Sequence, residues 1–329
     1  MPDNFTGRSK GKRIPLGHQT PYASALVLRT LVIMVGLATA GRALGQDYPI
    51  DQVPSYVPES ALFVSFGGSL NSINFGDQDI IAVGTSVASD GGVTVASGSA
   101  GPPANAPDGT LIQMDTQVNF APSLQAGYFG HTGNGNWLWG FKFTYDYLGT
   151  TSTYRRPIFP QAGTFTDGTD PPVPFTGNAV AFSTQTEVEH QLALRPFLGQ
   201  SFERGFVYIG GGPTVSREQS SVSQLVGFAD INGNRSDISG APQDFSTSSW
   251  VWGGSAEVGV TYFLDRSWFL DCSYVLGVTA NHSFDFASTF SSTFTNANGD
   301  VLDQAGTLVG SSSWHAVTQG IGLRVGRAF

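Results

Sequence analysis

Cysteine, lysine and long apolar runs are scarce in this chain of 329 residues. The single cysteine, Cys272, excludes an intramolecular disulfide and any metal site built from several cysteines. Beyond residue 45 no segment reaches the ~18 consecutive apolar residues that mark a transmembrane helix, and Lys142 is the only lysine there. Because the net charge is -9 and no basic stripe is present, we expect no binding to nucleic acid.

Glycine is abundant instead, with 42 residues, while methionine occurs only three times and charged residues make up 12%. This composition suits an all-β protein. The clearest pattern lies in Trp137–Tyr147, where every second residue is aromatic. Successive side chains of a strand point to opposite faces, so this period of two predicts a strand. Its aromatic face consists of Trp137, Trp139, Phe141, Phe143, Tyr145 and Tyr147.

The same alternation recurs along the chain and predicts eight strands. They cover residues 61–75, 114–128, 137–147, 184–202, 206–218, 250–264, 268–282 and 314–329. Short turns and long polar segments connect these strands alternately. The long segments, which we expect to be loops, are 76–110, 151–182, 220–248 and 284–310. A small hairpin is expected around Asp90-Gly91-Gly92 in the first of them.

The alternation of short and long connections is typical of a membrane-spanning β-barrel. Such barrels have an even number of antiparallel strands, short periplasmic turns and longer external loops. We therefore predict an all-β fold, an eight-stranded antiparallel transmembrane up-and-down β-barrel. It would cover residues 61–329, with four long external loops, and follow a short periplasmic lead at residues 46–60. The alternative is a soluble secreted β-barrel, which would dissolve without detergent.

Aromatic residues are expected to gather at both ends of the barrel strands, where they would form two girdles at the membrane interfaces. Aromatic residues are also common in the strands of soluble proteins, so it is their position at the strand ends that indicates a girdle. The short-turn ends carry Tyr128, Trp137, Tyr262 and Trp268, and the long-loop ends carry Tyr145, Tyr147, Trp250 and Trp252.

Residues 1–45 are typical of an export signal. Basic residues of an extended leader precede a short apolar run, Leu31–Ala40, although Arg29 interrupts its approach. Cleavage is expected after Gly45, with a competing site after Ala40, and translation could begin downstream of Met1. The chain is therefore predicted to leave the cytoplasm.

The final strand, Gly320–Phe329, alternates apolar and small or basic residues and ends in Phe329. Together with the strand rhythm and the export signal, this segment resembles the small eight-stranded outer-membrane barrels of Gram-negative bacteria. The OmpA-type and OmpX-type barrels and related surface proteins of alphaproteobacteria are the families it is most similar to. The resemblance implies the outer membrane as location and Phe329 as the signal for the barrel-assembly machinery. Outer-membrane lipid and that machinery are then the expected partners.

The inward face of the predicted barrel carries charges of both signs. Near mid-height we expect a network of five charged residues, Lys142, Arg195, Glu257, Asp271 and Arg324. Higher in the lumen we expect four acidic residues, Asp146, Glu187, Glu189 and Glu218. Charges away from bulk water must be paired, and eight strands leave an interior that side chains just fill. The sequence thus favours a plugged polar lumen over a conduction gate.

Catalytic, metal and cofactor sites are not expected. His282 and Ser283 are adjacent on one strand and point to opposite faces, which does not suit a nucleophile and its base. Gly210-Gly211-Gly212 lies within a strand and is not a phosphate loop. The run Asn296–Asp300 could hold Ca²⁺ but is more typical of a turn.

The predicted function is therefore that of an integral outer-membrane protein, not an enzyme, with a structural and surface-interaction role. Its external segments could bind an external ligand, because binding residues commonly lie on loops of a rigid scaffold. The alternative is a small passive channel or an OmpW-like carrier of small solutes.

Overall fold

The computed structural model describes residues 56–133, 135–167, 171–231, 234–296 and 299–329. The expected export signal at 1–45 and residues 46–55 of the expected lead lie outside these ranges. Strands dominate the described residues, and all of their pairings are antiparallel. No helix in these ranges is long and apolar enough to cross a membrane.

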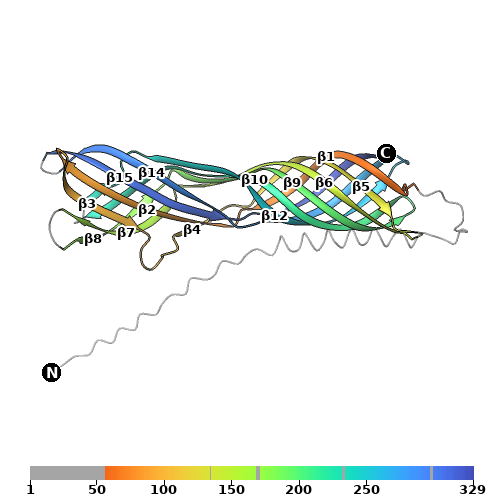
Figure 1. Ribbon diagram of the computed structural model, residues 1–329, viewed down its shortest axis with the longest axis horizontal. Coiled ribbons are helices and arrows are strands. Elements are labelled where there is room, and N and C mark those ends of the chain that lie inside the picture. The colour runs from red at the N-terminus through yellow and green to blue at the C-terminus, as the bar shows by residue number, and fades with distance from the viewer. Residues whose placement is uncertain (1–55, 134, 168–170, 232–233, 297–298) are drawn as a thin grey trace, which may run out of the picture. The chain divides into compact units, whose positions relative to one another are not determined.

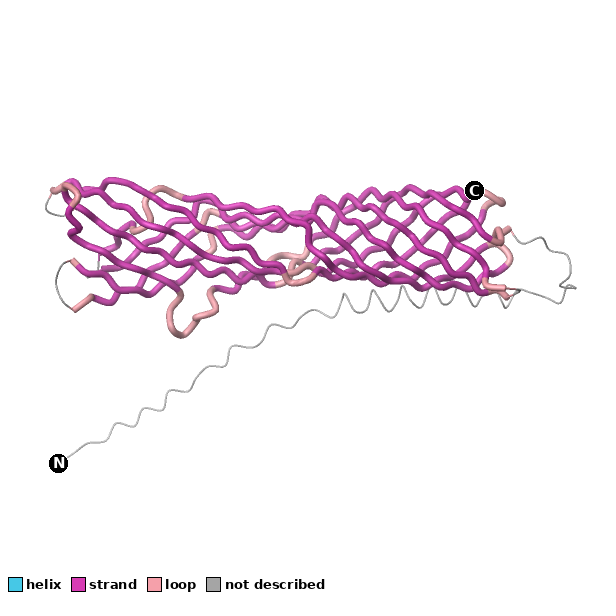
Figure 2. The backbone as a smooth tube through the Cα atoms, in the orientation of Figure 1, coloured by secondary structure: helices cyan, strands magenta, loops and turns pink. Residues whose placement is uncertain are grey.

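Eight strands form a closed barrel, which is the fold that the sequence predicts. Each pairs with its neighbour in chain order, and the last strand pairs back onto the first, with Phe63 opposite Ala328. Figure 2 shows this barrel as the more regular half of the described structure. Its strands are β1 (Ser60–Asn74), β5 (Gln117–His131), β6 (Trp137–Arg155), β9 (Ser183–Phe202), β10 (Gly205–Ile231), β12 (Gln243–Phe263), β13 (Trp268–Thr279) and β16 (Val317–Ala328).

The four segments expected to be loops are largely strands, so that prediction is wrong. They form a second antiparallel sheet, here called the upper sheet, which continues from the long-connection end of the barrel (Figure 1). Its order is β14, β15, β2, β3, β7, β8 and the far part of β10, with β4 pairing β2 and β11 pairing β10. The added strands are β2 (Asp77–Asp90), β3 (Val93–Gly101), β4 (Thr110–Gln113), β7 (Ile158–Thr166), β8 (Val173–Val180), β11 (Asn234–Asp237), β14 (His282–Thr295) and β15 (Val301–Trp314).

Composition explains why these strands escaped the sequence analysis. β3, for example, reads Val-Thr-Val-Ala-Ser-Gly-Ser-Ala-Gly, in which small residues hide the alternation of apolar and polar side chains. In β14 the alternation survives only as the inward residues Phe284, Phe286 and Phe290. The expected hairpin around Gly91 and Gly92 is confirmed, since both have positive φ between β2 and β3.

The barrel strands β6 and β10 continue beyond the ends expected at residues 147 and 218, and β10 runs on into the upper sheet, where it pairs with β8. Local irregularities allow this continuation. The β6–β9 ladder shifts register between Tyr147 and Thr150, beside Gly149 with a φ of 52°. The β10–β12 ladder shifts between Val222 and Leu225, beside Gln224, which also has a φ of 52°. Such bulges bend a strand without ending it.

Candidate functional site

The lumen nearest the short turns is filled by six phenylalanine rings, here called the aromatic plug. All are buried, and neighbouring rings lie in contact, for example Phe129 and Phe206 with centroids 5.3 Å apart. The members are Phe63, Phe129, Phe197, Phe206, Phe263 and Phe269. The sequence analysis described the inward face as polar and missed this plug, although the six residues share the inward phase of their strands. An apolar layer therefore closes the barrel beneath its charged layer.

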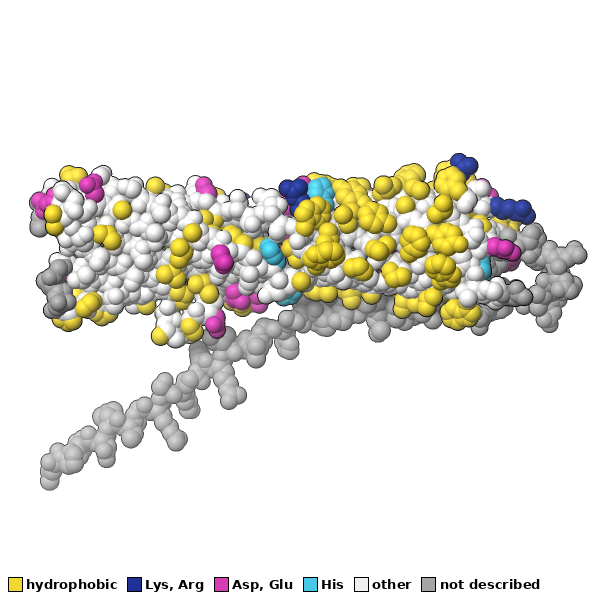
Figure 3. Space-filling model, viewed as in Figure 1, with side chains coloured by type: hydrophobic (Ala, Val, Ile, Leu, Met, Phe, Trp, Pro, Cys, Tyr) yellow, Lys and Arg dark blue, Asp and Glu magenta, His cyan; other side chains and the backbone are white. Residues whose placement is uncertain are grey.

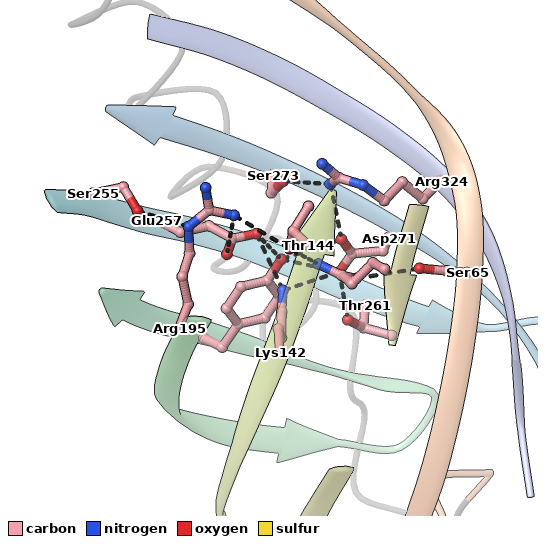
Figure 4. A network of polar contacts seen from close by, with 12 residues as sticks. Ser65, Lys142, Thr144, Arg195, Ser255, Glu257, Thr261, Asp271, Ser273 and Arg324 are labelled. Carbon is pink, nitrogen blue, oxygen red and sulfur yellow. Dashed lines mark hydrogen bonds and ion pairs between the residues drawn. The ribbon is translucent and has the colours of Figure 1, made fainter. Parts of the chain in front are cut away.

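The predicted mid-height charges meet above the plug (Figure 4). Lys142 Nζ lies 3.1 Å from Glu257 Oε1 and 3.9 Å from Asp271 Oδ1. Arg195 Nη1 lies 3.7 Å from Glu257 Oε2. Arg195 also donates through Nε to Ser255 Oγ at 2.8 Å. Glu257 thus has a cationic partner on each of its two carboxylate oxygens.

Arg324 completes the network from the last strand. Its Nη1 lies 3.7 Å from Asp271 Oδ2, and its Nη2 lies 3.8 Å from Asp146 Oδ1. Arg324 also donates hydrogen bonds through Nε to Ser123 Oγ at 2.9 Å and through Nη1 to Ser273 Oγ at 3.1 Å. Three cations, Lys142, Arg195 and Arg324, therefore balance three carboxylates, Glu257, Asp271 and Asp146. Such balance is what charges away from bulk water require.

Tyr208 is a central member of this network that the sequence analysis missed. Its hydroxyl group donates to Asp271 Oδ1 at 3.0 Å or Glu257 Oε1 at 3.1 Å, and Lys142 Nζ lies 3.5 Å from the centroid of its ring. A cation over an aromatic face is attracted by the ring quadrupole. The alternation along β10 predicts that Tyr208 points inward. A tyrosine between the apolar residues Val207 and Ile209 does not indicate, from sequence alone, that it contacts charged side chains.

The upper part of the lumen is closed by a second apolar cluster, here called the collar. Its member Trp314 donates through Nε1 to Glu218 Oε2 at 2.8 Å. Both side chains are fully buried, so Glu218 lies inward as predicted from its strand phase. The aromatic members of the collar are Phe75, Phe159, Phe245, Phe284, Phe286 and Trp314.

Glu187 and Glu189 do not lie in the lumen, which contradicts the sequence prediction. Both ladders of β9 skip Glu189, so a bulge there reverses the alternation of every residue above it. Val188 is consequently buried, whereas Glu189 lies on the outer surface 3.6 Å from Arg217 Nε and 3.2 Å from His190 Nε2. The upper lumen is therefore much less acidic than expected.

The outer surface of the barrel is an apolar belt. Large apolar side chains that are exposed include Phe66, Phe120 and Leu198. On the face seen in Figure 3, hydrophobic side chains gather over the barrel and are sparse over the upper sheet. The structure places Trp137, Tyr262 and Trp268 exposed at the short-turn end, and Tyr147, Trp250 and Trp252 exposed at the other. Tyr128 and Tyr145 are half-buried on the same face, where Tyr145 Oη hydrogen-bonds His190 Nδ1 at 3.0 Å.

A closed barrel with an apolar outer belt and aromatic side chains at both of its edges is a membrane barrel. In water this belt would be an exposed apolar patch far larger than soluble monomers carry, whereas in lipid it matches the hydrocarbon layer. Among membrane barrels, an even number of antiparallel strands with short turns at one end is typical of the outer membrane of Gram-negative bacteria. The chain is an integral outer-membrane β-barrel protein.

No protein-family model matches the chain, and no curated protein matches it either. Among solved structures it is similar to the outer membrane protein OprG from Pseudomonas aeruginosa, with 10% identity, 84% of this chain and 99% of that chain covered, and a TM-score of 0.28. Neisserial surface protein A has 12% identity, coverages of 72% and 96%, and a TM-score of 0.20. The translocator domain of the autotransporter NalP from Neisseria meningitidis has 13% identity, coverages of 94% of this chain and 100% of that chain, and a TM-score of 0.22. Because these TM-scores are low, the class stated above rests on the closed barrel and its belt.

The histidines lie in separate places. His282 Nε2 lies 2.7 Å from Ser249 Oγ, which bridges β14 and β12, and its ring packs edge-on against Trp314. Its neighbour Ser283 is exposed and takes no part in this contact. Within the described ranges no group of three or more His, Cys, Asp or Glu residues could hold a metal ion.

Proposed function

We propose that this protein has a structural and surface-interaction role in the outer membrane and that its barrel does not conduct solutes. The observation that supports this role is the filled lumen. The aromatic plug, the balanced charge network and the collar occupy successive levels of the barrel, and their side chains are buried. Between the plug and Lys142 lies a cavity of about 10 Å³, which is no more than one water molecule requires.

Opening this lumen would carry a large cost. A path past mid-height requires the cationic groups to leave Glu257 and Asp271, and breaking buried ion pairs is costly (about 3–5 kcal/mol each). The phenylalanine rings below would also have to move apart. The alternative of a small passive channel or an OmpW-like solute carrier through the barrel has no supporting observation at these levels.

The surface role follows from the upper sheet. Its strands extend the barrel beyond the apolar belt and carry mainly Ser, Thr and Asp on their exposed positions. Binding an external ligand or partner there is part of the proposal, as are contact of the belt with outer-membrane lipid and recognition of Phe329 by the barrel-assembly machinery. Absence of catalysis and membership of the OmpA-type or OmpX-type families belong to the same proposal.

Planar bilayers test the closed lumen. The refolded chain from residue 46 onwards is inserted, and its folding is verified by heat-modifiable gel mobility, with a general porin as the positive control for insertion. We expect no single-channel openings from the wild-type protein. Reproducible single-channel openings that change in Arg324→Ala would overturn the proposal, because Arg324 then lines a conducting path.

A further inference from the structure

The upper sheet encloses a cavity of about 730 Å³ that no part of the proposed function uses. This volume lies within the range of about 300–1,000 Å³ typical of small-molecule sites. The walls come from β2, β3, β7, β8, β10, β14 and β15, together with residues 237–242. The cavity is therefore built by segments far apart in the chain that only the upper sheet brings together.

The lining of this cavity is apolar and almost uncharged. Small Ala, Gly, Ser and Thr side chains alternate with five phenylalanine side chains, Phe165, Phe175, Phe228, Phe290 and Phe294. Asp237 is the only charged lining residue among those described, and its Oδ1 already accepts a hydrogen bond from Ser239 N at 3.0 Å. A charged ligand would lose its hydration without gaining an ion pair there, whereas an uncharged aromatic or aliphatic ligand would bury apolar surface.

Two glutamines supply polar groups to this lining. Gln304 is buried and donates through Nε2 to Ser86 Oγ at 2.8 Å, while Gln161 donates through Nε2 to the carbonyl oxygen of Pro160 at 3.1 Å. Each amide nitrogen has two hydrogens, so each retains one donor after these bonds. In ligand sites with apolar walls, a small number of polar groups at defined positions fixes the orientation of the ligand.

Access to the cavity comes from outside the barrel. Leu308 and Ala179, which line it, belong to the collar, so the collar is its floor. On one side the sheet ends at β14, which forms a ladder with β15 alone among the described strands. Residues around Gly240 face β14, since a Cβ added at Gly240 would lie 3.1 Å from Ser292 Oγ. Just beyond them, at the start of β12, Gln243 Oε1 accepts a hydrogen bond from Ser288 Oγ at 2.8 Å. Among the described residues no backbone hydrogen bond joins β14 to this segment, which borders the cavity.

We propose that this cavity binds one small uncharged molecule with an aromatic or branched aliphatic body and a single hydrogen-bonding group. The ligand enters from the cell exterior and is held above the closed lumen. This site goes beyond the proposed structural role. The presence or absence of conductance in planar bilayers would not test whether the cavity binds a ligand.

Photolabelling tests the site in the folded, detergent-solubilised protein. The probe is an uncharged aryl trifluoromethyl diazirine with a methoxy group, and labelled residues are mapped by mass spectrometry. We expect labelling of cavity residues such as Phe290 to saturate with probe concentration and to be lost with excess anisole. Labelling of the apolar belt from the micelle should not saturate. Absence of saturable cavity labelling would overturn the proposal.

A matched pair of variants on β2 identifies the position of the bound probe. Gly84 lines the cavity, and a Cβ atom added there would meet nothing closer than Thr307 O at 3.9 Å, so the backbone accepts a side chain at this position and Gly84→Trp is expected to fill the cavity. Val87 is exposed on the other face and does not line it. We expect loss of saturable labelling in Gly84→Trp and wild-type labelling in Val87→Trp.

Gly227→Leu provides a second filling variant on β10, where an added Cβ atom lies at an ordinary 3.5 Å from Ser239 Cβ. It keeps the test decisive if Gly84→Trp fails to show the folded gel mobility. Saturable labelling of the same residues that persists in a folded filling variant would contradict the proposed site.

Discussion

The ammonium group of Lys142 and the carboxylate of Glu257 lie 3.1 Å apart at the centre of the barrel, both almost fully buried. Their strands, β6 and β12, are not neighbours, because β9 and β10 lie between them. The pair therefore crosses the lumen and joins opposite walls. Its integrity governs both the stability and the closure of the barrel.

A double-mutant cycle measures this pair. Lys142→Met and Glu257→Gln each leave the buried network with one charge in excess, although Glu257 keeps Arg195 and Lys142 keeps Asp271 as a partner. We expect each variant to lower the free energy of unfolding by about 3–5 kcal/mol. The double variant should lose less than the sum, because the remaining buried charges then balance again. Denaturant unfolding in lipid vesicles provides the measurement. Arg327→Met, which removes an exposed cation of the same barrel, should change stability by less than about 1 kcal/mol.

Closure of the barrel between β1 and β16 depends on Gly67. A side chain there would contact the backbone carbonyl oxygen of Leu323 on the neighbouring strand, which cannot give way as a flexible side chain can. We expect Gly67→Ala to cost about 1–3 kcal/mol of stability, measured by the same unfolding assay. Gly254→Ala is the control, since a side chain at Gly254 would meet nothing within 4 Å. Equal stability of the two variants would show that close strand approach at Gly67 is not required.

The orientation of the barrel can be read from surface labelling. In a Cys272→Ser background, we expect Val301→Cys, exposed at the start of β15, to react with a membrane-impermeant maleimide on intact cells. Arg266→Cys, in the exposed turn between β12 and β13, should react only after the outer membrane is permeabilised. The reverse pattern would place the short turns outside the cell.

Asp265 makes the stability of the short turn between β12 and β13 depend on pH. Its Oδ1 accepts hydrogen bonds from Trp268 N at 2.8 Å and Ser267 N at 2.7 Å, and these bonds lower the pKa of the carboxyl group. A lowered pKa in the folded state means that the stabilisation is complete above the ordinary pKa of about 3.9 and is lost as the pH falls through the lower, folded value.

The test compares the Tm of wild-type protein with that of Asp265→Ala across this pH range. We expect a lower Tm for Asp265→Ala at neutral pH and convergence of the two values in strong acid. A Tm difference that stays constant with pH would assign the effect of the substitution to the loss of the side chain alone.

The terminal Phe329 is expected to act in assembly more than in stability. Its side chain is 70% exposed, so it contributes little packing to the folded barrel. We predict that Phe329→Ala reduces the amount of assembled barrel in cells, measured by heat-modifiable mobility of membrane fractions, yet refolds in detergent like the wild type. Phe202→Ala, which removes another exposed ring at the short-turn end, should assemble normally. Equal loss in both variants would argue for a packing role.

The eight barrel strands could be predicted because their signal is local. In Trp137–Tyr147 successive side chains point alternately outward and inward, so the type of each residue indicates the face on which it lies. The two faces differ chemically because the outer face contacts lipid and the inner face packs in the lumen. The same phases predicted the inward direction of Lys142 and Arg324. They failed for Glu187 and Glu189, because one skipped residue in β9 reverses the faces and leaves no trace in the composition.

The upper sheet and its cavity could not be predicted for a different reason. β15 pairs with β2, and β3 pairs with β7, across long stretches of chain. Their Ser, Thr, Gly and Ala residues resemble those of a polar loop, so only the partner strand distinguishes the two.

The sequence by itself determined the class of fold, the number of membrane strands and the inward direction of the mid-height charges, because alternation along a strand is a local property. Tertiary structure alone decided which charges meet, as with Lys142 and Glu257, 115 positions apart. It also decided that phenylalanine closes the lumen and that the upper sheet encloses a cavity. Those outcomes depend on pairing between distant strands, which no local pattern specifies.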